Sequence, residues 1–290
     1  MPVSKPVDVF ESAVPWGIEL SRVWRIGQFG RRKLERNGSF QDQRAGSSTE
    51  YLDQRVFSQG DSVRHINWRV FGRTDQLMVK LFHHEAAPKL DLVLDVSESM
   101  TWIAEKWELA AKLWALFGAL GDKAGSQVSG YLLSGEDLQQ TRWQEPQKAF
   151  EAIETDGTGL GALRRVPWQN QSLRVIISDL LFPGSPAGPL DIAARGSEST
   201  AWLVPESPQE ADPGCEGNVE FEDCESGKLA THQCDHTFWR RYRDRYEAHF
   251  RAWQIEQDRR DGQLVRVSTA HPLEQSLARL FAPAALLDPA

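Results

Sequence analysis

The stretch "LDLVLDVSESM", residues 90–100, decides the fold class. Residues 90–96 are almost continuously apolar, which is typical of a strand buried on both faces of a parallel sheet. Asp95, Ser97 and Ser99 then place three oxygen-bearing side chains at alternate positions, directly before a helical pattern. The stretch therefore predicts a buried strand whose carboxyl end presents a carboxylate and two hydroxyls.

Strand-like and helical segments alternate after this stretch. Further apolar runs occupy residues 127–134, 173–182, 200–206 and 263–269. Between the first two strands, residues 104–125 carry leucines at helical spacing: Leu109, Leu113, Leu116 and Leu120. Strands that alternate with helices predict an α/β fold, with a mostly parallel sheet covered by helices on both faces. We assign residues 88–285 to this domain.

Residues 1–87 follow a different pattern. Brief alternating runs occur in "EYLDQRVFS" (50–58) and "QLMVKLF" (76–82), and turn signals stand at Gly46, Gly60–Asp61 and Thr74–Asp75. This pattern predicts short antiparallel strands. We therefore expect residues 1–87 to form a β-rich accessory region.

The composition excludes several classes of function. The chain has 290 residues, 33 basic and 41 acidic, and a formal charge of −8. This balance argues against a general affinity for nucleic acid or an anionic membrane. No apolar run approaches the roughly 20 residues that a membrane span needs, and the first residues lack a signal-peptide pattern. We expect a cytoplasmic protein without a membrane span.

Residues 235–262 predict a long helix with one aromatic stripe: Trp239, Tyr242, Tyr246, Phe250 and Trp253. Arginines interleave with these aromatics, an arrangement that can stack on single-stranded nucleic acid. Because acidic residues are mixed with the arginines, we favour core packing of the stripe with the arginines in solvent.

The end of the first strand is also the predicted functional site. In open α/β sheets, ligands bind outside the carboxyl ends of the strands. Asp95, Ser97 and Ser99 offer hard oxygen ligands there, suited to Mg²⁺ or another divalent cation such as Mn²⁺. Thr158, in the loop "DGTGLG", and Asp179, at the end of "LRVIISD", would face the same crevice. The alternative for Ser97 or Ser99 taken alone is a helix cap.

The same strand end suggests no catalytic residue. Phosphatases of the haloacid dehalogenase type need a second Asp two residues after the nucleophile, and Ser97 stands at that position. Gly-x-Ser-x-Gly and Gly-x-x-x-x-Gly-Lys patterns are absent,. We therefore predict that the protein is not an enzyme. The alternative is a metal-dependent hydrolase that uses Asp95 on a phosphorylated substrate.

Two motifs carry a resemblance to known families. Asp95-x-Ser97-x-Ser99, with Thr158 and Asp179, resembles the metal-ion-dependent adhesion site of von Willebrand factor type A domains. The segment "QGDSVRHINWRVFGRTDQLMVKLFHHE" (59–85) resembles the signature of the bacterial family called domain of unknown function 58. The sequence departs from the family pattern at Asn67 and Gly159, where aspartate is common.

The resemblance implies a von Willebrand factor A-like, Rossmann-like fold for residues 88–285. It also implies that Ser97, Ser99 and Thr158 bind the cation directly or through water, while Asp95 and Asp179 hold its waters. The open position of the ion would accept an acidic residue of a protein partner. Family members are often encoded beside MoxR-type AAA+ ATPases, so the implied role is an adaptor or assembly factor that works with such an ATPase or its client.

Overall fold

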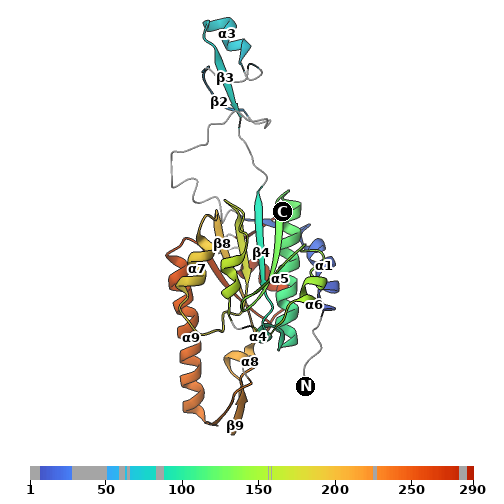
Figure 1. Ribbon diagram of the computed structural model, residues 1–290, viewed down its shortest axis with the longest axis vertical. Helices are drawn as coiled ribbons and strands as arrows, with labels where there is room; N and C mark the ends of the chain where they lie inside the picture. The colour runs from blue at the N-terminus through green and yellow to red at the C-terminus, as the bar shows by residue number, and fades with distance from the viewer. Residues whose placement is uncertain are drawn as a thin grey trace. The chain divides into compact units, whose positions relative to one another are not determined.

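The computed structural model describes residues 7–27, 51–58, 63, 66–82, 88–155, 157, 159–224, 227–280 and 286–290 (Figure 1). The chain divides into two compact units. One contains residues Met1–Lys33 together with Lys89–Ala290, and the other contains Leu34–Pro88. In the described parts, no helix is both long enough and apolar enough to cross a membrane.

The larger unit is built on a sheet of six strands among the described residues. They are β4 (Lys89–Asp95), β5 (Gln127–Ser134), β6 (Asp137–Thr141), β7 (Leu173–Ile177), β8 (Ser199–Glu206) and β11 (Gln263–Ser268). Their order is β11-β8-β7-β4-β5-β6, and every pairing is parallel except that of β5 with β6. The predicted mixed α/β fold with a mostly parallel sheet is therefore confirmed.

Strand β4 is buried on both faces, as its mostly apolar run predicts. Leu92 and Leu94 belong to one hydrophobic cluster, and Val93 belongs to the other. Since side chains alternate between the faces of a strand, one run of residues supplies both cores.

Helices cover the two faces (Figure 1). The helix α5 (Ala104–Lys123) fills one cluster with Trp107, Leu113 and Trp114. The long helix α9 (His236–Asp258) covers the other face together with α7 (Ala187–Ala194) and the 3₁₀ turn η3 (Gly161–Arg165). Shorter helices are α4 (Glu98–Thr101), α6 (Gln147–Ala152), α8 (Pro208–Ala211) and α10 (Leu273–Leu280).

The aromatic stripe of α9 packs as predicted. Tyr246, Phe250 and Trp253 are buried in the second cluster, and Tyr242 is half-buried against it. Trp239 is buried as well, and its Nε1 donates a hydrogen bond of 2.6 Å to the carbonyl of Cys215. The arginines between these aromatics therefore lie on the solvent side of the helix.

The N-terminal residues differ from the prediction of one accessory region at 1–87. The helix α1 (Val9–Leu20) packs on α5 within the larger unit, where Phe10 and Ala13 are buried. Gly17 allows this approach, because a Cβ there would lie 2.6 Å from the backbone carbon of Ala115. Strands β1 (Trp24–Ile26) and β12 (Leu287–Pro289) then pair antiparallel.

The smaller unit has the antiparallel strands that its alternation predicts. Strands β2 (Tyr51–Val56) and β3 (Met78–Phe82) pair with each other, and α3 (Trp68–Thr74) lies between them in the sequence. Asn67 Nδ2 donates a hydrogen bond of 3.1 Å to Gln54 Oε1.

A second hairpin separates β8 from α9. Strands β9 (Gly217–Glu222) and β10 (Leu229–Cys234) pair antiparallel in a sheet of their own. Phe221 and His232 contact the ring of Phe238 in the first turn of α9, with ring centroids 6.2 and 5.5 Å from it. Aromatic contacts thus hold this otherwise exposed hairpin against the helix.

Candidate functional site

Asp95 closes the central strand of the sheet and lies between two neighbours. It pairs with Leu133 of β5, while the preceding Leu94 pairs with Ile177 of β7. The side chain is 1% exposed. Oδ1 accepts a hydrogen bond of 3.0 Å from the backbone N–H of Ser97, and Oδ2 accepts one of 2.7 Å from the hydroxyl of Ser178. Both carboxylate oxygens are therefore held in place.

Ser97 and Ser99 bring their hydroxyl oxygens within 3.2 Å of each other. Ser97 occupies the N-cap position of α4, yet its side chain makes no capping hydrogen bond. The cap hypothesis therefore does not describe Ser97. Ser97 is 2% exposed and Ser99 is half-buried, so the pair opens toward solvent on the side of Ser99.

Asp179 follows β7, the neighbour of β4, as predicted. Its side chain is buried, and Oδ1 accepts a hydrogen bond of 3.1 Å from the N–H of Leu181. Its own backbone N–H donates to the sulfur of Met100 over 3.2 Å, which ties this segment to α4. The structure thus brings Asp95, Ser97, Ser99 and Asp179 to one carboxyl edge of the sheet.

The two carboxylates interact electrostatically. Burial, and then the negative charge of Asp179, raise the pKa of Asp95 from its ordinary value to about 7,. The hydrogen bonds from Ser178 and Ser97 act in the opposite direction without cancelling these effects. A cation bound at this edge would relieve the repulsion and favour the ionised form of Asp95.

Thr158 lies outside the described residues, but the glycines on either side of it are described. The N–H of Gly157 donates a hydrogen bond of 3.1 Å to the hydroxyl of Ser134, next to the residue that pairs with Asp95. Gly159 has a φ of 75°, a conformation that favours glycine,.

Lys106 is a member of the site that sequence reasoning missed. It is fully buried, and its ammonium donates to Asp179 Oδ2 over 2.9 Å and to Glu210 Oε1 over 2.5 Å. Burial alone would lower the pKa of Lys106, but the charges of Asp179 and Glu210 outweigh it and raise the pKa,. A signal was present in the sequence, because Lys106 precedes Leu109 and Leu113 on the apolar stripe of α5.

The loop after β7 contains a second overlooked feature. Leu180 is buried with a φ of 59°, which is uncommon for a residue with a side chain,. Its N–H donates to the Ser178 hydroxyl over 3.1 Å, and its carbonyl lies 2.8 Å from Nε2 of His249 on α9. These contacts fix the backbone on both sides of Asp179 in a conformation that local sequence does not favour.

The donor set is chemically suited to a small hydrated cation. The hydroxyl pair presents two neutral oxygens, and the carboxylates of Asp95 and Asp179 already accept hydrogen bonds on each oxygen. Hydroxyl and carboxylate oxygens are both ligands that such a cation accepts, and the carboxylates would also supply negative charge. Within the described residues, no three His, Cys, Asp or Glu side chains gather as a metal-binding group.

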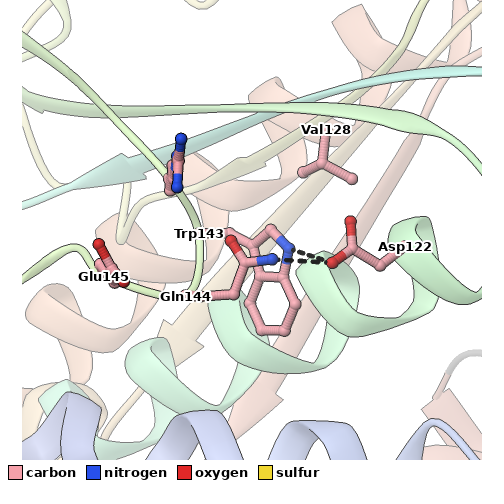
Figure 2. A pocket seen from close by; sticks show the side chains of 6 residues that line it. Asp122, Val128, Trp143, Gln144 and Glu145 are labelled. Carbon is pink, nitrogen blue, oxygen red and sulfur yellow. Dashed lines mark hydrogen bonds between the residues drawn. The ribbon is translucent and has the colours of Figure 1, made fainter.

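A cavity lies at the other end of the sheet. It has a volume of about 490 Å³ and is lined by Val128 near the start of β5 and by Asp122 in the last turn of α5. Figure 2 shows Trp143 and Gln144 both pointing to Asp122, whose Oδ2 accepts their hydrogen bonds of 3.0 and 2.8 Å. Three of its polar side chains thus bond one another, and we assign no function to the cavity.

Comparison with known proteins identifies relatives of this chain. It is 27% identical over 208 residues to the uncharacterized protein Rv1480 of Mycobacterium tuberculosis (strain H37Rv) and to the uncharacterized protein Mb1516 of Mycobacterium bovis. The match covers 66% of this chain and 65% of each relative.

Among solved structures, the chain is similar to the conserved hypothetical protein BatB from Bacteroides thetaiotaomicron. The TM-score is 0.40 at 14% identity, covering 69% of this chain and 99% of BatB. An aerotolerance-related membrane protein from Bacteroides fragilis gives 0.38 at 16% identity, covering 68% and 100%. A family model matches residues 53–255, and the chain therefore belongs to the family of proteins of unknown function DUF58.

Proposed function

We propose that this protein is a non-catalytic, divalent-metal-dependent module for protein interaction, with a von Willebrand factor A-like site. The observation that carries the proposal is the hydroxyl pair of Ser97 and Ser99, 3.2 Å apart, beside two buried carboxylates from neighbouring strands. Mg²⁺ or Mn²⁺ is the cation that such oxygens suit best.

The negative charge of the two carboxylates gives a physical reason for a cation to bind here. Asp95 and Asp179 repel each other in a buried place, and Lys106 offsets only part of the charge of Asp179 because it also pairs with Glu210. A divalent cation on the hydroxyl pair would complete the neutralisation. An acidic side chain of a partner could then fill the open coordination position, so that metal and partner each raise the affinity for the other.

A MoxR-type AAA+ ATPase, or a client of such an ATPase, is the partner that we propose from the family resemblance. The module would act in the assembly or maturation of a protein complex, and we propose that it does so in the cytoplasm.

A role as a phosphoryl-accepting nucleophile fits Asp95 poorly. Such a nucleophile needs an accessible oxygen, whereas Asp95 is 1% exposed and accepts a hydrogen bond on each oxygen,. Turnover of p-nitrophenyl phosphate that disappears in Asp95→Asn would contradict this conclusion and establish the hydrolase alternative.

The test is isothermal titration calorimetry with Mg²⁺ and Mn²⁺. Wild type should bind one of these cations, and Ser99→Ala should lose most of the affinity while keeping its melting temperature. Ser12→Ala is the matched control, since that hydroxyl is exposed on α1 and bonds the carbonyl of Val9. Binding of a purified MoxR-type ATPase should likewise disappear with chelator and in Ser99→Ala. The proposed function is wrong if wild type and Ser99→Ala bind the cations with equal affinity, and if both bind the ATPase equally well with and without chelator.

A further inference from the structure

A groove lies between the hairpin strand β10 and the first half of α9, away from the hydroxyl pair. Its volume is about 370 Å³, and it is lined by His232, Gln233, Asp235, Phe238, Arg241, Tyr242 and Arg245. Phe238 and Tyr242 are half-buried, whereas Arg241 and Arg245 are exposed. The groove therefore combines aromatic side chains with two guanidinium groups that reach solvent.

The two arginines are available to a ligand. Among the described residues, neither Arg241 nor Arg245 forms an ion pair, although Arg243 between them pairs with Asp212 at 2.9 Å. Asp235 is the acidic residue of the lining, and its Oδ1 already caps α9 by accepting the N–H of Phe238 over 2.7 Å. A cationic groove on a chain with a formal charge of −8 favours an acidic ligand,.

The spacing of the arginines suits an extended chain. Residues four apart on a helix have Cβ atoms roughly 5–6 Å apart. Acidic residues at alternate positions of an extended segment are separated by about 6.6 Å. Two successive acidic side chains on one side of such a segment could therefore each meet one guanidinium. Strand β10 runs along the same groove and pairs only with β9 within the described part of the chain, so an extended segment could also approach its second edge,.

The groove is connected to the hydroxyl-pair site by a chain of direct contacts. The hydroxyl of Tyr242 donates to the carbonyl of Glu210 over 2.6 Å, and the carboxylate of Glu210 accepts from Lys106. Lys106 in turn donates to Asp179. Figure 1 shows α4, α8 and β9 toward the same end of the larger unit. One partner could thus contact both places.

We infer that the groove of Arg241 and Arg245 binds an extended segment of a protein partner that carries Asp or Glu at alternate positions. The inference rests on the proposed function for the claim that the ligand is a protein. It adds a second contact that needs no metal, because no hydroxyl or carboxylate of the candidate metal site lines the groove.

The probe is a fluorescein-labelled octapeptide of alternating glutamate and serine, followed by fluorescence anisotropy at low ionic strength. Wild type should bind it, and Arg241→Gln/Arg245→Gln should bind it about tenfold more weakly or worse, as expected for lost charged hydrogen bonds. The control Arg240→Gln/Arg251→Gln removes the same charge from exposed positions of α9 outside the groove and should bind like wild type. Circular dichroism should show all variants folded.

Several results would overturn the inference. One is that wild type does not bind the alternating peptide. Another is that both double variants lose the same affinity for it. A third is that wild type binds a peptide with four consecutive glutamates as tightly as the alternating peptide. Tighter binding of an oligothymidylate, lost in the groove variant, would assign the groove to nucleic acid instead. A dimer in sedimentation that Arg241→Gln/Arg245→Gln dissociates would assign it to a second copy of the chain. Chelator and Ser99→Ala should leave peptide binding unchanged, so this test can fail independently of the proposed metal-dependent function.

Discussion

The ammonium of Lys106 lies 2.9 Å from Oδ2 of Asp179, with 0% and 3% of the two side chains exposed. This ion pair joins the first turn of α5 to the loop after β7, across a separation of 73 residues in the sequence. It places a positive charge beside the Asp179 carboxylate of the candidate site. The electrostatics of this edge therefore depend on a residue that the strand-end motif does not contain.

Lys106→Met should strongly destabilise the protein. Removing one partner of a buried ion pair leaves an uncompensated charge, here on Asp179, at a cost of about 3–5 kcal/mol. The free energy of unfolding from urea titrations measures this. Arg164→Gln is the control, since its ion pair with Glu136 is 62% and 59% exposed, and should change stability by less than about 1 kcal/mol. A loss for Lys106→Met as small as that of the control would contradict a structural ion pair.

Asp95→Asn should remove a pH dependence of stability in the presence of chelator. The pKa of Asp95 is raised to about 7 in the folded state, against about 3.9 in an unfolded chain. Between these values the folded state binds more protons, so the stabilisation is complete below about pH 4 and is lost as the pH rises to about 7. Wild type should therefore lose stability over this range relative to Asp95→Asn.

Urea titrations of both proteins at several pH values check this expectation. Parallel pH profiles for wild type and Asp95→Asn would show that Asp95 is not protonated in the folded protein near neutral pH. Saturating Mg²⁺ should reduce the loss in wild type, since a bound cation stabilises the carboxylate form.

Ser178→Ala should raise the pKa of Asp95 further, because the Ser178 hydroxyl stabilises the carboxylate by donating to Oδ2 over 2.7 Å. The substitution also leaves the N–H of Leu180 without its acceptor, at a cost of about 1–3 kcal/mol,. Carbon-13 NMR titration of the Asp95 carboxyl measures the first effect. The control Ser197→Ala removes a hydroxyl that bonds the carbonyl of Ala194, and the pKa of Asp95 should not move.

Gly157→Ala should weaken Mg²⁺ binding with little effect on the core. A Cβ at Gly157 would lie 2.6 Å from the backbone of Ser134 and Gly135, so the loop before Thr158 would have to move away from the end of β5. In α7, Gly188→Ala meets nothing within 4 Å and is the matched control. Calorimetry with Mg²⁺ and thermal melts of both variants separate the two effects. Unchanged Mg²⁺ affinity in Gly157→Ala would remove Thr158 from the proposed ligand set.

The order of strands and helices in the larger unit could be predicted because the information is local. Mostly apolar runs such as residues 90–96 specify strands buried on both faces, and leucines at helical spacing specify α5. The sequence did not indicate that α1 joins this unit. The packing of α1 depends on a close approach of Gly17 to Ala115. The hydrophobic periodicity of a sequence does not indicate contacts between residues that are so far apart in the chain.

By itself, the sequence determined that Asp95, Ser97 and Ser99 stand at a strand end, since alternation along the strand and its abrupt stop are properties of neighbouring residues. It also indicated Asp179 by the same local pattern on β7. Only the tertiary structure decided what surrounds them. Lys106, Ser178 and Glu210 reach this edge from α5, the loop after β7 and α8. The hydrogen bond from Ser178 acts on the pKa of Asp95, while Lys106, which also pairs with Glu210, holds Asp179. The physical reason is that electrostatic forces act through space between groups that folding brings together, whereas periodicity reports only which side of its own element a residue occupies.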